Sequence, residues 1–252
     1  MMSYSHILLT APLVTAFAAV HILIGRLRFL SAVPRSAFLS FAGGVAVTYV
    51  FMHILPELAE HNAVFAGALG MGKAAAEVLV YGMGLIGLAL FYGLERLVKI
   101  KRGRHKERRE VALAEEGLLW IHLGTFALYN ALIGYLLVRR EEDGTWALLL
   151  YFVAMALHFV TADFGMRDDH KRDYDRIARW VLAAAVTAGW AVSLAIELPR
   201  LAIGLLFAFL AGGVVLNVLK EELPEERKSR FLPFLGGAGA FALLVVGERL
   251  LV

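Results

Sequence analysis

One segment of this chain occurs twice. The first copy begins at Ala42-Gly43-Gly44-Val45 and reaches Leu55-Pro56-Glu57, and the second begins at Ala211-Gly212-Gly213-Val214 and reaches Leu223-Pro224-Glu225. A further apolar stretch follows each copy and ends in the dipeptide Glu-Arg. Because the same three parts recur in the same order, we expect the chain to be built from two related halves.

Apolar residues dominate the chain and determine its class. Of the 252 residues, 60% are hydrophobic and 19% are charged, and the charges gather in short clusters between long apolar runs. A helix needs about 20 apolar residues to cross the hydrocarbon core of a bilayer. We therefore expect an all-α integral membrane protein, with a single transmembrane domain over residues 1–252 and eight spanning helices. These are expected near His6–Gly25, Phe38–Pro56, Ala75–Val98, Gly117–Val138, Trp146–Phe164, Ile177–Glu197, Leu201–Leu219 and Phe231–Val252.

Basic residues are distributed unequally among the connections between these spans. The first, third, fifth and seventh connections hold nineteen Lys and Arg, seven of them in Lys99–Arg109, and the other three connections hold four. Basic loops face the cytoplasm, so we expect both termini on the non-cytoplasmic side of the plasma (inner) membrane. Recruitment of anionic lipid or of a regulatory partner by Lys99–Arg109 is the alternative interpretation.

This orientation makes the two copies of the repeat inverted with respect to each other. The second span then runs outwards and the seventh inwards, and two halves of opposite topology are the usual basis of alternating access in secondary transporters. The glycine pairs are expected to let neighbouring helices approach closely. Pro56 and Pro224 are each expected to end a helix, because proline lacks an amide donor and clashes with the preceding turn.

The segment Ala42–Leu58 resembles the second span of the ZIP family of zinc and iron transporters. Leu210–Glu225, followed by Phe231–Leu244, is similar to the seventh and eighth spans of that family. The resemblance covers essentially the full length of the chain. It implies eight spans with both termini outside, and a secondary carrier for divalent cations.

The same resemblance implies a division of the chain into three parts. Spans one to three, about residues 1–98, form an inverted repeat with spans six to eight, about residues 177–252. Spans four and five, about residues 117–164, lie between the two halves. The transported ion would be zinc, iron or manganese, moving towards the cytoplasm.

The family's transport site lies on spans four and five, where this chain departs from the family pattern. In span four, Tyr129 and Asn130 align with the family's His-Asn, and the later ligand position holds Ile133. In span five, the stretch from His158 to Asp163 keeps a His and a terminal acid. The resemblance thus implies a depleted central site, for which Asn130 and His158 are the candidate metal ligands. The central pathway is expected to include Asn130, His158, Asp163, Tyr129 and His122.

Helix geometry limits how these central residues can act together. Asp163 lies five residues after His158 and is rotated by about 140° around the helix axis. It is therefore not expected to share an ion with His158 unless the helix is irregular. Structural and catalytic zinc sites use three or four protein ligands, so a further span must contribute or no metal binds there. His122, Tyr129 and His21 are the further donors considered.

Two groups of ligand-type residues are expected at the mouths of the pathway. At the outer mouth, His53 and Glu57 have the i,i+4 spacing that places two side chains on one helical face, and we consider both as metal ligands. Glu60 and His61 follow closely. At the inner mouth, negative charge gathers at Glu221, Glu222 and Glu225. The alternative at both mouths is a solvated cluster of positively and negatively charged side chains at the membrane edge. The acidic and basic run Asp168–Asp175 is expected to form a salt-bridged surface loop.

Three functions stay open on the sequence alone. The first is a ZIP-like secondary carrier of divalent cations, and the second is a transport-inactive protein that keeps the fold as a sensor or regulator. The third is a carrier for a different solute, favoured by the aromatic residues Tyr129 and Phe159. We do not expect an enzyme, because the chain has no nucleotide-binding loop, cysteine or Gly-x-Ser-x-Gly motif.

The expected partners follow from the same observations. The lipid bilayer is one partner, and a divalent cation is the second, as transported substrate; no tightly bound cofactor is expected. The net charge of +3 lies in loops that the membrane explains, so no nucleic acid is expected. A homodimer is compatible with the sequence.

Overall fold

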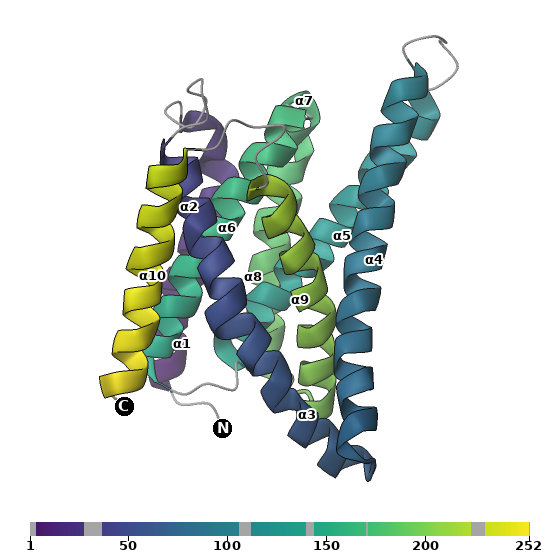
Figure 1. Cartoon of the computed structure of the whole chain (residues 1–252). Coiled ribbons are helices and arrows are strands. Elements are labelled where there is room, and N and C mark those ends of the chain that lie inside the picture. The colour runs from purple at the N-terminus through teal and green to yellow at the C-terminus, as the bar shows by residue number, and fades with distance from the viewer. Residues whose placement is uncertain are drawn as a thin grey trace.

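The computed structural model of the chain describes residues 4–27, 37–105, 112–139, 144–169, 171–222 and 230–251. Within these ranges the protein is entirely helical and contains no strand, which confirms the predicted all-α class. The helices form eight rods that run up and down through one bundle (Figure 1). α10 and α4 stand at opposite edges of this bundle, and the chain begins and ends at the same end of it (Figure 1).

Three of the rods combine several helical segments, and the first of them joins α1 and η1. The second rod joins α2, the π-turn η3 and α3, and the sixth joins α7, the π-turn η4 and α8. The elements are α1 (Tyr4–Leu23), η1 (Ile24–Arg26), α2 (Ala37–Tyr49), η3 (Val50–Ile54), α3 (Leu55–Leu69), α4 (Lys73–His105), α5 (Ala112–Arg139), α6 (Thr145–Asp169), α7 (Lys171–Asp173), η4 (Tyr174–Ala178), α8 (Arg179–Ala195), α9 (Arg200–Glu222) and α10 (Phe231–Leu251).

Five of these rods are long and apolar enough to cross a membrane. They are Ile7–Arg26, Ala37–Leu69, Lys73–Gly93, Thr145–Asp168 and Lys171–Ala195. The other three described rods carry shorter apolar stretches, Leu123–Arg139, Arg200–Leu216 and Phe231–Gly247. Large apolar side chains also cover the outside of the bundle: Leu8, Val78 and Leu243 are 73%, 74% and 75% exposed. Such surfaces are suited to lipid rather than water, and together with the five long apolar rods they indicate an integral membrane protein.

The prediction that Pro56 ends its helix is wrong. The rod continues through the proline to Leu69, a total of 33 residues. Just before the proline, the amide of Leu55 donates to the carbonyl of Val50, five residues earlier, as in a π-helix. This wider turn accommodates the missing amide donor of Pro56 without ending the helix. The rod ends instead at Gly70, whose φ of +62° gives the left-handed conformation typical of a helix C-terminus. Pro224 lies outside the described residues.

Glycine allows α2 and α10 to cross with their backbones almost in contact. A Cβ atom added to Gly44 would lie 2.0 Å from the carbonyl oxygen of Phe234, and one added to Gly237 would lie 2.0 Å from the carbonyl oxygen of Phe41. No other residue type fits at such a separation. The packing role predicted for Gly44 is therefore confirmed.

Two other helix pairs cross in the same way. Between α4 and α9, an added Cβ on Gly212 would lie 1.9 Å from the carbonyl oxygen of Gly84, and one on Gly87 would meet the α9 backbone at 2.0 Å. Between α5 and α8, a Cβ atom added to Gly134 would lie 2.0 Å from the carbonyl oxygen of Val186. One added to Gly189 would lie 1.8 Å from the carbonyl oxygen of Ala131. Because lipid provides no hydrophobic drive for helix association, such close van der Waals packing is a main source of cohesion in a membrane bundle.

Candidate functional site

The described members of the predicted central set lie in the interior of the bundle. Tyr129 and Asn130 are on α5, His158 and Asp163 are on α6, and all four side chains are buried. His122 belongs to α5, but its side chain is outside the described part of the chain. The helices therefore bring together the described members of the predicted central set, although they do so in two separate groups.

The first group consists of Tyr129, Asn130 and His158. The ring of Tyr129 packs against that of His158, with centroids 5.6 Å apart. The side-chain amide of Asn130 donates to the carbonyl of Phe126 on its own helix at 2.8 Å. The amide oxygen of Asn130 and the hydroxyl of Tyr129 are buried and have no hydrogen-bond partner among the described residues. These two oxygens are the atoms of this group that a polar ligand would contact, because a buried polar atom without a partner is costly.

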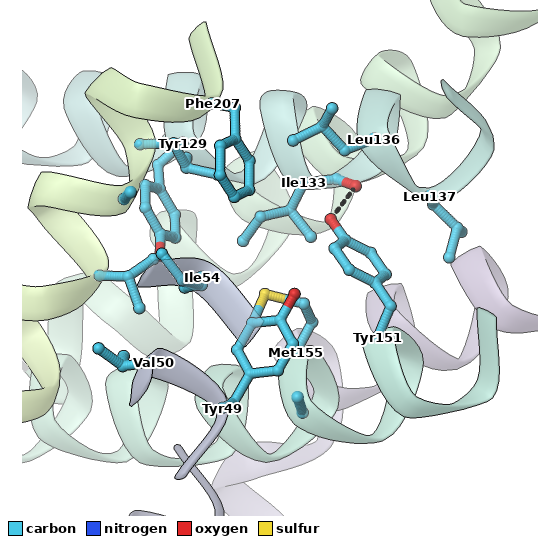
Figure 2. Close-up of a cluster of buried hydrophobic side chains, with 14 of the residues drawn as sticks. Tyr49, Val50, Ile54, Tyr129, Ile133, Leu136, Leu137, Tyr151, Met155 and Phe207 are labelled. Atoms are coloured by element: carbon cyan, nitrogen blue, oxygen red, sulfur yellow. Dashed lines mark hydrogen bonds between the residues drawn. The ribbon is translucent and has the colours of Figure 1, made fainter. Parts of the chain in front are cut away.

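Apolar side chains fill the space beside this group. Figure 2 shows Val50 and Ile54 of η3 beside Tyr129 and Ile133 of α5, in one cluster that also includes Met155 of α6. Ile133, which occupies a position where the ZIP pattern has a strong ligand, is fully buried there. Its carbonyl accepts a 2.9 Å hydrogen bond from the hydroxyl of Tyr151 (Figure 2). Hydrophobic packing therefore fills the space between η3, α5 and α6.

The second group joins α6 to α1. Asp163 Oδ2 lies 2.6 Å from His21 Nδ1, and both side chains are almost completely buried. The ring of Phe159 lies against the His21 ring at 4.5 Å, and Tyr174 of η4 donates its hydroxyl to the His21 carbonyl at 3.1 Å. His21 Nε2 is buried and has no hydrogen-bond partner within the described ranges. The sequence indicated His21 only as a further donor, since nothing in it links residues 142 positions apart.

An ion pair lies one helical turn beyond Asp163. Arg167 donates two hydrogen bonds to the carboxylate of Asp175, at 2.6 Å and 2.9 Å. Both side chains are partly exposed. Within the predicted run Asp168–Asp175, Arg172 Nε lies 3.8 Å from Asp173 Oδ1, so a salt bridge is present, but the described residues of this run are helical rather than a loop. α6 continues to Asp169, and helix resumes at Lys171.

His53 and Glu57 form a pair on the second rod. His53 Nε2 lies 3.6 Å from Glu57 Oε2, with side-chain exposures of 9% and 12%. The ring of His53 stacks on that of Tyr49 at 4.7 Å. His53 is the central residue of the 33-residue rod, which places it about 24 Å from either end at a rise of 1.5 Å per residue. The pair therefore lies at the mid-length of the rod, not at the helix end where the sequence was expected to place it.

Glu60 and His61, expected beside this pair, point in different directions. Glu60 is exposed, whereas His61 is buried against the ring of Phe207 on α9, with centroids 5.3 Å apart. His61 also packs over Gly204, where an added Cβ would lie 3.0 Å from the His61 ring. The four predicted residues thus do not form one cluster.

The predicted inner cluster falls largely outside the described residues. Glu221 and Glu222 belong to the last turn of α9, but their side chains are not described, and Glu225 lies outside the described ranges.

Of the candidate ligands, His53 and Glu57 form a His–carboxylate pair, whereas His158 and Asn130 lie in the group with Tyr129. His21 and Asp163 form a second His–carboxylate pair. Within the described ranges, no three His, Asp or Glu side chains lie close enough together to hold a metal ion. Comparison of the chain with protein-family models and with curated proteins gives no match.

Proposed function

We propose that the protein is a ZIP-like secondary carrier that moves a divalent metal cation, such as zinc, iron or manganese, towards the cytoplasm. The observation that carries this proposal is the His53–Glu57 pair, an imidazole and a carboxylate largely buried at the mid-length of an apolar rod. Ionisable groups at such depth are costly and are usually retained for function.

The geometry of this pair suits a transiently bound cation. Two ligands of a tetrahedral zinc ion, each about 2.0–2.1 Å from the metal, lie about 3.3 Å apart. The 3.6 Å between His53 Nε2 and Glu57 Oε2 needs only a small adjustment to reach that value. Water would complete the coordination shell. Two protein ligands hold an ion weakly, as a carrier requires if the ion is to leave again.

The glycine crossings support the ZIP-like inverted repeat. The first copy of the repeat is on α2 and the second is on α9; α2 crosses α10, and α9 crosses α4. In an inverted repeat that equates span two with span seven and span three with span eight, these two crossings are equivalent. The basic connections then favour termini on the non-cytoplasmic side.

One observation favours a second function, that of a transport-inactive membrane protein with a sensory or regulatory role. Tyr129, Ile133 and Phe159 occupy positions where the ZIP pattern has ligands, and all three are buried in apolar packing. A carrier has to open a path beside these residues, whereas a regulatory protein does not.

Uptake into proteoliposomes distinguishes the two functions. Vesicles with the protein and empty vesicles are compared for Zn²⁺, Fe²⁺ and Mn²⁺, and the double variant His53→Ala/Glu57→Ala is compared with the parent. We expect uptake above the empty vesicles, and in the double variant a larger rise in KM than fall in maximal flux. Glu60→Ala, on the exposed face of the same rod, is the matched control and should behave as the parent. The absence of flux for all three ions would favour the regulatory function.

A further inference from the structure

The sixth rod carries a row of arginines that the proposed cation site does not use. We propose that the exposed stripe of this rod, which begins at Arg172 and Arg176, passes Trp180 and ends at Val192, binds an anionic phospholipid. The arginines hold the phosphate of the headgroup, and the apolar part of the stripe contacts an acyl chain. The inference does not require cation transport.

The π-turn η4 aligns the upper part of this stripe. The amide of Arg179 donates to the carbonyl of Tyr174, five residues earlier, as in a π-helix. Because such a turn is wider than an α-helical one, residues four apart come close to one line. Arg172, Arg176 and Trp180 have that spacing, and all three are exposed. They therefore form one row on the outside of the bundle.

The positive charge of this row is only partly neutralised by the described acidic residues. Arg172 Nε lies 3.8 Å from Asp173 Oδ1, but the Arg172 side chain is 90% exposed, and an exposed pair of this kind contributes little. Arg176 is exposed and forms no salt bridge within the described ranges. Like charges four residues apart on a helix repel each other. An anion that bridges Arg172 and Arg176 therefore relieves an unfavourable interaction.

Arg179 adds a third cation beside the row. Its guanidinium lies over the ring of Trp180, 5.1 Å from the centroid, which holds it at the outer surface of the rod. Its Nε is buried and has no hydrogen-bond partner in the described part of the chain. Arg179 also acts on the carboxylate of Asp175 through its charge, but that carboxylate already accepts two hydrogen bonds from Arg167. The charge of Arg179 is thus available to a further anion.

Beyond Trp180 the exposed face of the rod becomes apolar. Ala184, Ala188 and Val192 continue it at intervals of four residues, and all are exposed. At a rise of 1.5 Å per residue, the stretch from Trp180 to Val192 is about 18 Å long, close to the thickness of about 15 Å of one leaflet of the hydrocarbon core. Tryptophan is typical of the membrane interface. Along the stripe, cationic, aromatic and aliphatic side chains thus follow the order of phosphate, interface and acyl chain in a phospholipid.

The place of the arginines in the fold favours an anionic lipid over a zwitterionic one. They lie at the α7 end of the bundle, opposite to the end where the chain begins and ends (Figure 1). On the orientation that the basic connections favour, this end faces the cytoplasm, where the membrane leaflet carries anionic lipids. A zwitterionic headgroup would bring its own cation close to the arginines. An acidic protein segment would contact the arginines but leave the apolar part of the stripe uncovered.

Binding of phosphatidylglycerol tests the proposal. The full chain in detergent is titrated with phosphatidylglycerol and with phosphatidylcholine of the same acyl chains, and bound lipid is counted by native mass spectrometry. One basic residue near an anionic membrane surface is worth about a fivefold gain in affinity. We therefore expect the parent to bind phosphatidylglycerol severalfold more tightly, and Arg176→Gln/Arg179→Gln to lose most of this preference. Arg200→Gln, which changes an exposed arginine where α9 begins at the other end of the bundle, is the matched control and should keep it.

Quenching of tryptophan fluorescence tests the position of the acyl chain. Phosphatidylglycerol with brominated chains should quench the parent more than brominated phosphatidylcholine does, and this difference should be smaller in Trp180→Phe. If the double arginine variant does not fold, Arg176→Gln alone, which changes an exposed side chain, provides the binding comparison. Equal binding of the two lipids by the parent, or a preference that survives the arginine substitutions, would overturn the proposal. Quenching that does not depend on Trp180 would also overturn it and would leave the arginines to an acidic protein segment.

Discussion

The two His–carboxylate pairs of this protein are built in opposite ways. His53 and Glu57 lie four residues apart on one rod, at 3.6 Å and with the carboxylate partly accessible. His21 and Asp163 come from two rods and lie 142 positions apart, at 2.6 Å and without solvent. The local pair persists however the rods move, and in the proposed carrier it could hold a ligand throughout the cycle. The pair between rods exists only while α1 is packed on α6, so it responds to the packing itself.

The largest effect on stability is expected when one member of the His21–Asp163 pair is removed. Asp163→Ala leaves His21 buried without its partner, and breaking a buried pair in this way costs about 3 kcal/mol or more. The measurement is the free energy of unfolding in mixed detergent micelles. The double variant His21→Ala/Asp163→Ala should recover part of the loss, because no unpaired ionisable group is left. Equal losses in the single and double variants would mean that the two side chains do not interact.

A smaller effect on stability should follow from moving α5 and α8 apart near the His21–Asp163 pair. Gly134→Ala places a Cβ 2.0 Å from the carbonyl oxygen of Val186 and forces α5 away from α8. Overpacking of this kind costs about 1–3 kcal/mol, and it should disturb the contact of Tyr174 with His21 more than the local pair. The free energy of unfolding of Gly134→Ala is compared with that of Gly82→Ala. In the described part of the chain, no atom lies within 4 Å of a Cβ added to Gly82, so a similar loss in both variants would contradict the packing explanation.

The contrast between the pairs also explains what the sequence could predict. The eight apolar rods follow from runs of apolar residues, and the contact of His53 with Glu57 follows from i,i+4 spacing, because both signals are local. The contact of His21 with Asp163 depends on which rods are neighbours. A single sequence carries no local pattern for that, so His21 was indicated only as one of several donors.

Pro56 shows a different limit of sequence reasoning. A proline within a helix removes one amide donor, and the local rule predicts that the helix ends. In a membrane protein, a π-turn can provide hydrogen-bond partners for the backbone groups that the proline leaves unpaired, and the helix then continues. The bond from Leu55 to Val50 is such an adjustment. Because the rod continues, the pair that was expected at a helix end lies at its middle.

Removing one hydrogen bond beside the His21–Asp163 pair should have a modest effect on stability. Tyr174→Phe removes the hydroxyl that donates to the His21 carbonyl at 3.1 Å and keeps the ring in the core. Hydrogen bonds between membrane helices are worth about 0.6 kcal/mol on average, and we expect a loss of that size in mixed micelles. Thr187→Val, which removes a hydroxyl that bonds within α8, is the matched control and should change stability less.

The smallest effect on stability is expected at the local pair. Glu57→Gln keeps the shape of the side chain and removes its charge. Because His53 Nε2 and Glu57 Oε2 are 3.6 Å apart, longer than a hydrogen bond, we expect a loss of about 0.5 kcal/mol or less. The functional effect should be larger than the structural one, since the neutral amide is a poorer ligand for a divalent cation than the carboxylate. In proteoliposomes, Glu57→Gln should raise KM for the transported cation severalfold and leave the unfolding free energy within that small range. Asp163→Asn should do the reverse, with a clear loss of stability. If Glu57→Gln destabilises the protein as much as Asp163→Asn does, then both pairs hold the bundle together, and the division into a ligand-holding pair and a packing-dependent pair is wrong.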